Sequence, residues 1–212
     1  MIIHTHKAIF VHIPKTAGSS IEVALNAFEK TNTGAVDEAT GTFHPVTTGK
    51  EKHYDPRAYR KHYGRKVWQD YYKFTLVRNP WQRIHSWWWN NRYITGKFDM
   101  PFAEFLHSRL ADPDELPRAL RPQTRWITSA KGNIEMDYIC HFETIDKDFK
   151  TVCEQIGAPL TELPRVLVDN RNPASRPYYT DDYDADLVDL VARVYADDIR
   201  QLQYQFGDQV DM

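Results

Sequence analysis

A mostly apolar run near the start of the chain is followed by a loop and then by a helical pattern. Residues 9–13 form the apolar run, residues 14–20 form the loop, and apolar residues at helical spacing follow from Ile21 to Phe28. The run predicts a buried strand, and the later spacing predicts a helix. The amide groups and partial positive charge at the start of such a helix can hold an anion. This segment therefore predicts an α/β unit with a phosphate-binding loop.

The side chains of the loop suit an anionic ligand. Lys15 supplies a full positive charge, Ser19 and Ser20 supply hydroxyl donors, and Gly18 lets the backbone approach an anion closely. In a Walker A loop the lysine follows the last glycine and precedes a hydroxyl that holds magnesium. Here Lys15 precedes Gly18. The order of residues thus argues against a standard nucleoside-triphosphate loop.

A second strand-to-helix segment carries a matching pair of polar residues. Residues 72–77 read as a strand, Asn79 is a favourable N-cap and Pro80 suits the first helical position. Ser86 lies eight residues after Arg78, which corresponds to about two helical turns from the start of the helix. Arg78 at the strand end and Ser86 on the helix can therefore hold one phosphate together.

Together these motifs resemble the PAPS-dependent sulfotransferases, of the carbohydrate-type and bacterial sulfotransferase family 2 kind. PAPS is 3′-phosphoadenosine 5′-phosphosulfate. The first loop is similar to the family's 5′-phosphosulfate loop, and Arg78 with Ser86 is similar to its 3′-phosphate motif. Residues 122–126, 141–143 and 170–179 are also similar to recurring family segments. The resemblance covers nearly the whole chain and implies sulfuryl transfer from PAPS, with PAP as product and no required metal.

The resemblance also implies a set of site residues. Lys15 is expected to stabilise charge on the leaving phosphate, and His53 or His44 to remove a proton from the acceptor. His53 lies between the two phosphate motifs, where many relatives place a histidine. The residues expected to bind the cofactor are Lys15, Thr16, Ala17, Gly18, Ser19, Ser20, Arg78, Ser86, Gln123 and Arg125.

Strand and helix patterns alternate along the rest of the chain. Residues 136–142 read as a third strand, and further strands are expected within residues 30–50 and 110–135, with a loop over the site at 30–52. Helices are expected after Asp55, after Asp99, over 146–156, and as one apolar stripe over 187–206. We therefore expect an α/β, P-loop-like, three-layer fold with a central parallel sheet flanked by helices, in one domain spanning 1–212.

Composition and charge limit the classes of partner that we expect this protein to bind. A net charge of −2 argues against a nucleic-acid binder, and no apolar run is long enough for a membrane span or a signal peptide. Cys140 and Cys153 have neither metal-site nor disulfide spacing, so we expect a soluble, cytoplasmic protein. Residues 50–66 are rich in lysine and arginine and could attract an anionic glycan. The oligomeric state is left open.

The sequence leaves two other functions open. A P-loop kinase or NTPase would share the strand-loop-helix unit, although the lysine order and the lack of a convincing acidic magnesium ligand disfavour it. A catalytically inactive nucleotide-binding module would share the same motifs, although retention of Lys15, Arg78 and Ser86 argues against it. The leading interpretation is transfer of a sulfuryl group to a hydroxyl or amine of a carbohydrate or small metabolite.

Overall fold

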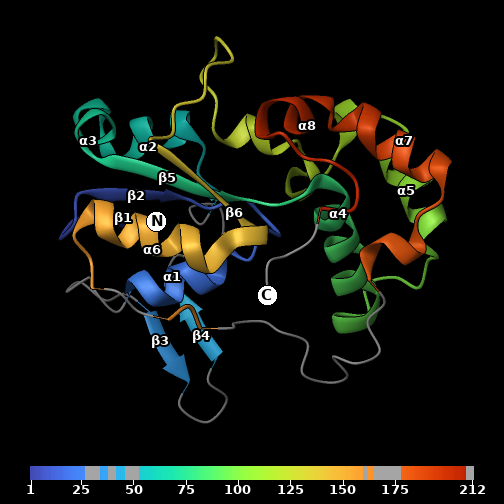
Figure 1. Ribbon diagram of the computed structural model, residues 1–212, viewed down its shortest axis with the longest axis horizontal. Coiled ribbons are helices and arrows are strands. Elements are labelled where there is room, and N and C mark those ends of the chain that lie inside the picture. Colours follow the sequence, from blue (N-terminus) through green and yellow to red (C-terminus); the bar gives the residue numbers. More distant parts are fainter. Residues whose placement is uncertain (27–33, 38–41, 46–52, 160–161, 165–177, 209–212) are drawn as a thin grey trace.

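A computed structural model describes residues 1–26, 34–37, 42–45, 53–159, 162–164 and 178–208 of the 212-residue chain. In these residues strands and helices alternate through the first half, and helices dominate the second (Figure 1). The strands are β1 (Ile2–Ile3), β2 (Ala8–Val11), β3 (Gly34–Asp37), β4 (Thr42–Pro45), β5 (Tyr72–Val77) and β6 (Tyr138–His141). The α-helices are α1 (Gly18–Asn26), α2 (Pro56–Tyr63), α3 (Arg65–Asp70), α4 (Pro80–Trp89), α5 (Phe102–Leu110), α6 (Ile145–Ile156), α7 (Ala185–Val194) and α8 (Ala196–Leu202). A π-helical turn, η2 (Asn90–Ile94), and the 3-10 turns η3 (Pro113–Glu115), η4 (Arg118–Leu120), η5 (Gln123–Trp126), η6 (Phe142–Thr144) and η8 (Tyr179–Asp182) complete the set.

The main sheet has the order β1-β2-β5-β6. Strands β2, β5 and β6 are parallel, with Phe10 paired to Phe74 and Phe74 to Tyr138. Strand β1 is antiparallel at the edge, so the sheet is mixed rather than purely parallel. All three strands expected from the apolar runs are confirmed. The carboxyl ends of β2 and β5 lead into α1 and α4 at the same edge of the sheet, where ligands bind in open α/β folds.

Helices cover both faces of this sheet. Figure 1 shows α1 and α6 on one face and α2 and α3 on the other. The first face buries a cluster that includes Phe10, Ile21 and Phe149, while the second packs Ile9 and Val11 against aromatic residues of α2 and α3. The expected α/β arrangement of a sheet flanked by helices is therefore confirmed.

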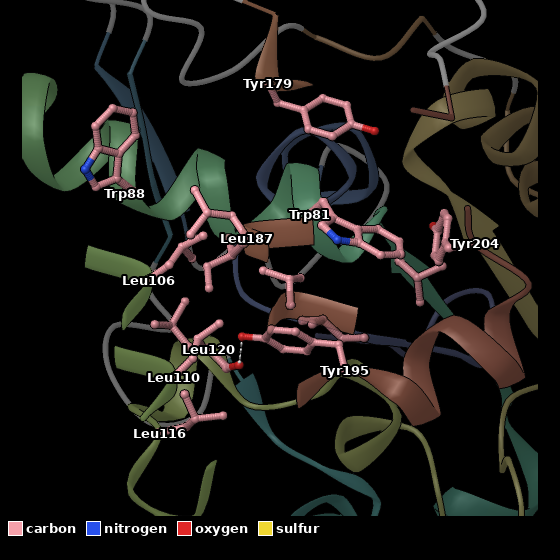
Figure 2. Close-up of a cluster of buried hydrophobic side chains, with 14 of the residues drawn as sticks. Trp81, Trp88, Leu106, Leu110, Leu116, Leu120, Tyr179, Leu187, Tyr195 and Tyr204 are labelled. Carbon is pink, nitrogen blue, oxygen red and sulfur yellow. Dashed lines mark hydrogen bonds between the residues drawn. The ribbon is translucent and has the colours of Figure 1, made fainter. Parts of the chain in front are cut away.

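A second core fills the helical part of the molecule. Trp81 and Trp88 of α4 pack with Leu106 and Leu110 of α5 and with residues of α7 and α8 (Figure 2). The hydroxyl of Tyr195, at the junction of α7 and α8, donates a hydrogen bond of 2.6 Å to the carbonyl oxygen of Leu120 (Figure 2). Helix α4 therefore joins the sheet to the helical part.

Local helix signals were accurate. The Asp55 side chain caps α2 by accepting from the Ala58 amide at 2.8 Å, and the Asn79 side chain caps α4. Gly157, at φ 66°, ends α6 in the left-handed conformation that favours glycine. These residues act as the sequence predicted because capping depends on neighbours within one turn.

Two expectations were wrong, and a third was confirmed only in part. Residues 110–135 contain 3-10 turns and an isolated bridge between Thr128 and Ile134, and no strand of the main sheet. Residues 30–50 do contain strands, but β3 and β4 form a separate antiparallel pair; the rest of the loop expected at 30–52 lies outside the described residues. The stripe over 187–206 is broken at Tyr195 into α7 and α8 and ends at Leu202.

A buried carboxylate on α8 holds η5 in place. Asp198 is fully buried, and it accepts hydrogen bonds from the main-chain amides of Gln123 and Thr124 at 2.7 and 2.8 Å and from the Thr124 hydroxyl at 2.9 Å. Burial raises the pKa of Asp198, and the Thr124 amide opposes the shift. The carboxylate is therefore the anchor of a turn far from it in sequence.

We expect Asp198→Asn to lower the free energy of unfolding by about 1–3 kcal/mol, because the NH2 group that replaces one carboxylate oxygen would face buried donors and cannot accept from them. Urea denaturation measures the change. Asp197→Asn is the matched control, since that neighbouring side chain is exposed and pairs with Arg200 on the surface. Equal stability of the two variants would contradict the anchoring role.

Candidate functional site

The loop after β2 has a strained backbone that suits anion binding. Lys15 and Ala17 have φ angles of 68° and 69°, a left-handed conformation that residues with a Cβ rarely adopt. The Thr16 hydroxyl fixes the turn by donating to the Ile13 carbonyl at 2.9 Å. Alternating backbone conformations of this kind turn successive amide groups toward one concavity. The strain is therefore concentrated where the sequence predicted a phosphate loop.

Helix α1 begins directly after this turn. Gly18 is its first residue, so Ser19 and Ser20 lie in its first turn rather than at the N-cap. The Ser20 amide donates to the Ala17 carbonyl at 3.1 Å. Amides and hydroxyls of a first turn are the groups that bind anions at a helix N-terminus.

Gly18 is required by a neighbour that the sequence reasoning missed. A Cβ at this position would lie 2.6 Å from Cδ2 and 2.7 Å from Nε2 of His12, which is closer than real Cβ contacts allow. His12 is buried at the end of β2, and its Nδ1 lies 2.8 Å from a carboxylate oxygen of Glu22 on α1. The sequence did carry a signal for this contact, because His12 interrupts an apolar strand and Glu22 lies among the apolar residues of the following helix. His12 thus connects strand, loop and helix.

The second motif is held from both sides. Arg78 is 8% exposed as a residue. Its guanidinium lies over the Phe142 ring at 4.0 Å and donates through Nε to Gln82 at 2.9 Å. The Gln123 amide group bonds both main-chain atoms of Arg78: its oxygen accepts from the Arg78 amide at 2.9 Å, and its nitrogen donates to the Arg78 carbonyl at 2.8 Å. Gln123 therefore orients Arg78, and direct contact between its side chain and a nucleotide stays a prediction.

Ser86 lies on α4, two turns after the capped start of the helix. It is 9% exposed, close to the value for Arg78. The N-cap residue, Asn79, is itself held in place, because its main-chain N–H donates to the buried Glu143 carboxylate at 2.8 Å. The helix that carries Ser86 therefore starts from a defined position relative to β5 and β6.

Arg83 is a positioning residue that the sequence reasoning missed. Its side chain is buried on α4, and its Nε donates to the carbonyl of Pro14 at 2.9 Å. The two terminal nitrogens donate to the carbonyls of Arg121 at 3.1 Å and Ala119 at 2.8 Å. Burial lowers the pKa of Arg83. One guanidinium thus ties the phosphate loop to the turn at 118–121.

His53 lies beside the phosphate loop. Its Nδ1 is 2.9 Å from the carbonyl oxygen of His12, and the two imidazole ring centres are 4.7 Å apart. Because a carbonyl oxygen only accepts hydrogen bonds, Nδ1 carries a proton. In the neutral ring Nε2 is then the nitrogen that can take a proton from a ligand.

His44, the reserve candidate, lies on another part of the molecule. It belongs to β4, where it pairs with Ala35 of β3. Figure 1 shows β3 and β4 near the lower edge and α2 near the upper edge, on opposite sides of the main sheet. The backbone of His44 is therefore separated from α2, which begins at Pro56, shortly after His53.

Arg125 is exposed on η5 and lines a cavity of about 400 Å³ together with Arg57, Arg118 and Arg121. We call this the basic cavity.

Cys140 and Cys153 are buried free thiols, and burial raises the pKa of both. Within the described ranges, no cluster of three metal-ligating side chains occurs, and no helix is long and apolar enough to cross a membrane.

Comparison with known proteins agrees with this geometry. The sequence profile of the sulfotransferase family matches residues 1–205, and the chain therefore belongs to that family, which implies a transferase. Among curated proteins, an uncharacterized protein of Archaeoglobus fulgidus is 26% identical over 101 residues, covering 47% of this chain and 79% of that protein. No solved structure gives a significant match.

We expect Arg83→Lys to lower the free energy of unfolding by roughly 2–3 kcal/mol, because an ammonium group cannot reach three carbonyls with the geometry of a guanidinium. Urea denaturation measures the loss. Arg109→Lys, an exposed change of the same type on α5, is the control and should stay close to the parent. Parent-like stability of Arg83→Lys would show that the three hydrogen bonds do not hold the loop.

Proposed function

We propose that the protein transfers a sulfuryl group from PAPS to a hydroxyl group of an acceptor. One observation carries the proposal: the two motifs predicted to bind phosphate follow adjacent parallel strands, β2 and β5, in a chain that belongs to the sulfotransferase family. Loops at the carboxyl ends of neighbouring parallel strands meet at one edge of the sheet. Such an edge can hold a donor that carries two separate phosphate groups.

The residues present fit the two phosphates of this donor. The strained loop at Lys15 and Ala17 and the first turn of α1 suit the 5′-phosphosulfate, because backbone of this kind and helix N-termini bind anions and Lys15 adds a positive charge. Arg78 and Ser86 suit the 3′-phosphate, because guanidinium and hydroxyl donors form charge-assisted hydrogen bonds with it. Both side chains are mostly buried, which strengthens such bonds.

When bound, PAPS supplies an activated sulfuryl group whose leaving group is the 5′-phosphate of PAP. Lys15 would stabilise the negative charge that develops on the bridging oxygen as the sulfur–oxygen bond breaks. The acceptor oxygen forms the new bond to sulfur, and its proton passes to a base. Nε2 of His53 is suited to take it, because the His12 carbonyl holds the proton on Nδ1.

The acceptor is proposed only by class. A hydroxyl-bearing carbohydrate or small metabolite suits the family, and it also suits His53, which is half-buried and so partly accessible from solvent. Part of the basic segment over residues 50–66 is neutralised internally: Arg60 pairs with Glu135, and Lys66 pairs with Asp70. Attraction of an anionic glycan by this segment as a whole is therefore weaker than its composition indicates.

Titration calorimetry with adenosine 3′,5′-bisphosphate (PAP) and adenosine 5′-monophosphate (AMP) tests the donor. We expect PAP to bind about 10- to 100-fold more tightly, because only PAP has a 3′-phosphate for charge-assisted hydrogen bonds. Ser86→Ala should weaken PAP binding by about 2- to 10-fold and leave AMP binding unchanged, since one neutral donor is lost.

Ser108→Ala removes the same hydroxyl group from the surface of α5, where it donates to the Phe105 carbonyl, and should change neither affinity. Equal affinity for PAP and AMP in the parent protein would contradict the proposed donor. An unchanged PAP to AMP ratio in Ser86→Ala would remove Ser86 from the 3′-phosphate site.

His53→Gln should lower kcat by about 100- to 10,000-fold while the Kd for PAP stays close to the parent value, because the imidazole serves the acceptor and not the donor. The parent rate should fall at acidic pH, since a protonated imidazole cannot accept a proton. Single-turnover transfer from PAPS measures the rate.

His62→Gln, on the exposed side of α2, is the matched control and should retain turnover. His44→Gln should also retain it. Loss of turnover in His44→Gln, with activity kept in His53→Gln, would move the role of base to His44.

A further inference from the structure

The basic cavity has a charge imbalance that its own residues do not relieve. Four arginines and one aspartate line it, which gives a formal charge of +3, and the other lining residues are uncharged. The one carboxylate, Asp55, is engaged as the N-cap of α2 through the Ala58 amide. Among the described residues, none of the four arginines forms an ion pair with a carboxylate. An anion would reduce the repulsion among these charges.

Two of the arginines are held in place by the backbone. Arg118 donates to the carbonyl of His53 and lies over the Trp126 ring at 4.9 Å. Arg121 donates through Nε to the Leu116 carbonyl at 3.4 Å, and its own carbonyl accepts from Arg83. Guanidinium groups that are already positioned lose less side-chain entropy when they bind a ligand.

A neighbouring cavity shows what balanced charge looks like in the same molecule. It has a volume of about 620 Å³ and contains Arg60, Arg65 and Lys73. Glu135 and Asp137 also line it; the first pairs with Arg60 at 2.5 Å and the second with Lys73 at 2.8 Å. Two of its three cations are therefore neutralised internally, whereas the basic cavity retains its excess.

The basic cavity adjoins the proposed base. Arg118 bonds the main chain of His53, and the Trp126 ring, which lines the cavity, lies 6.1 Å from the His53 ring. We infer that the basic cavity binds a sulfate or carboxylate group of the acceptor and so directs an acceptor hydroxyl toward His53. This inference rests on the proposed function. It assigns Arg57, Arg118, Arg121 and Arg125 to the acceptor, and Arg125 no longer to the nucleotide.

Titration calorimetry on the full chain without nucleotide tests the inference. The probes are three disaccharides of equal size, one with a sulfate ester, one with a uronate carboxylate and one uncharged. We expect the parent to bind at least one anionic probe tenfold or more tightly than the uncharged one. The stronger of the two identifies the anion.

Arg57→Gln/Arg125→Gln should weaken binding of that probe tenfold or more. These residues are chosen because both are exposed and because, among the described residues, neither contacts His53 or the phosphate loop. Arg109→Gln/Arg193→Gln removes the same charge from exposed positions on α5 and α7 and should change binding less than twofold. PAP affinity should stay within twofold in both variants, which also shows that they are folded.

Three results would overturn the inference. One is equal binding of charged and uncharged probes by the parent. Another is parent-like binding of the anionic probe by Arg57→Gln/Arg125→Gln. The third is a parallel loss of PAP affinity in that variant, which would place the cavity in the donor site. Failure of the parent to bind PAP, with arginine-dependent binding of the anionic probe intact, would contradict the proposed function and still support an anion site.

Discussion

The buried guanidinium of Arg83 is the interaction on which the geometry of the site depends. A buried cation is costly unless polar groups surround it, and the carbonyls of Pro14, Ala119 and Arg121 supply them. These carbonyls belong to the phosphate loop and to the turn that carries Arg118 and Arg121, while Arg83 itself lies on the helix of Ser86. Three segments must therefore be correctly placed at once. The loop proposed to bind the donor and the cavity proposed to bind the acceptor thus share one structural support.

The turn η5 carries one residue that contacts Arg78 and another that lines the basic cavity. Gln123 points its amide into the protein and fixes both main-chain atoms of Arg78, whereas Arg125 is exposed in the basic cavity. Asp198 of α8 holds the turn from behind through the amides of Gln123 and Thr124. The C-terminal helices thus align a residue at the end of β5 through a chain of buried hydrogen bonds. Such a chain is sensitive to loss of any member, because each buried donor needs its acceptor.

Much of the fold followed from local pattern. Apolar runs located β2, β5 and β6, and capping residues such as Asp55 and Asn79 located helix starts, because both signals act over a few residues. The strands expected in 110–135 do not form, since that stretch is organised by contacts with Arg83 and Asp198. The helix expected over 187–206 breaks at Tyr195, whose hydroxyl bonds Leu120, a partner 75 residues away.

The sequence by itself determined the family, and it predicted the phosphate loop, the joint role of Arg78 and Ser86, and the candidate base His53. Each of these depends on residue order over a short stretch. Only the tertiary structure decided why residue 18 must be glycine, since the clash is with the His12 ring packed against it. The tertiary structure also decided which basic side chains lack a carboxylate partner among the described residues. Arg60 and Arg57 lie one turn apart on α2, yet folding brings Glu135 to the first and three more arginines to the cavity of the second. The net charge of a segment can be counted from its sequence. Whether each charge is paired depends on distances between side chains, which only folding sets.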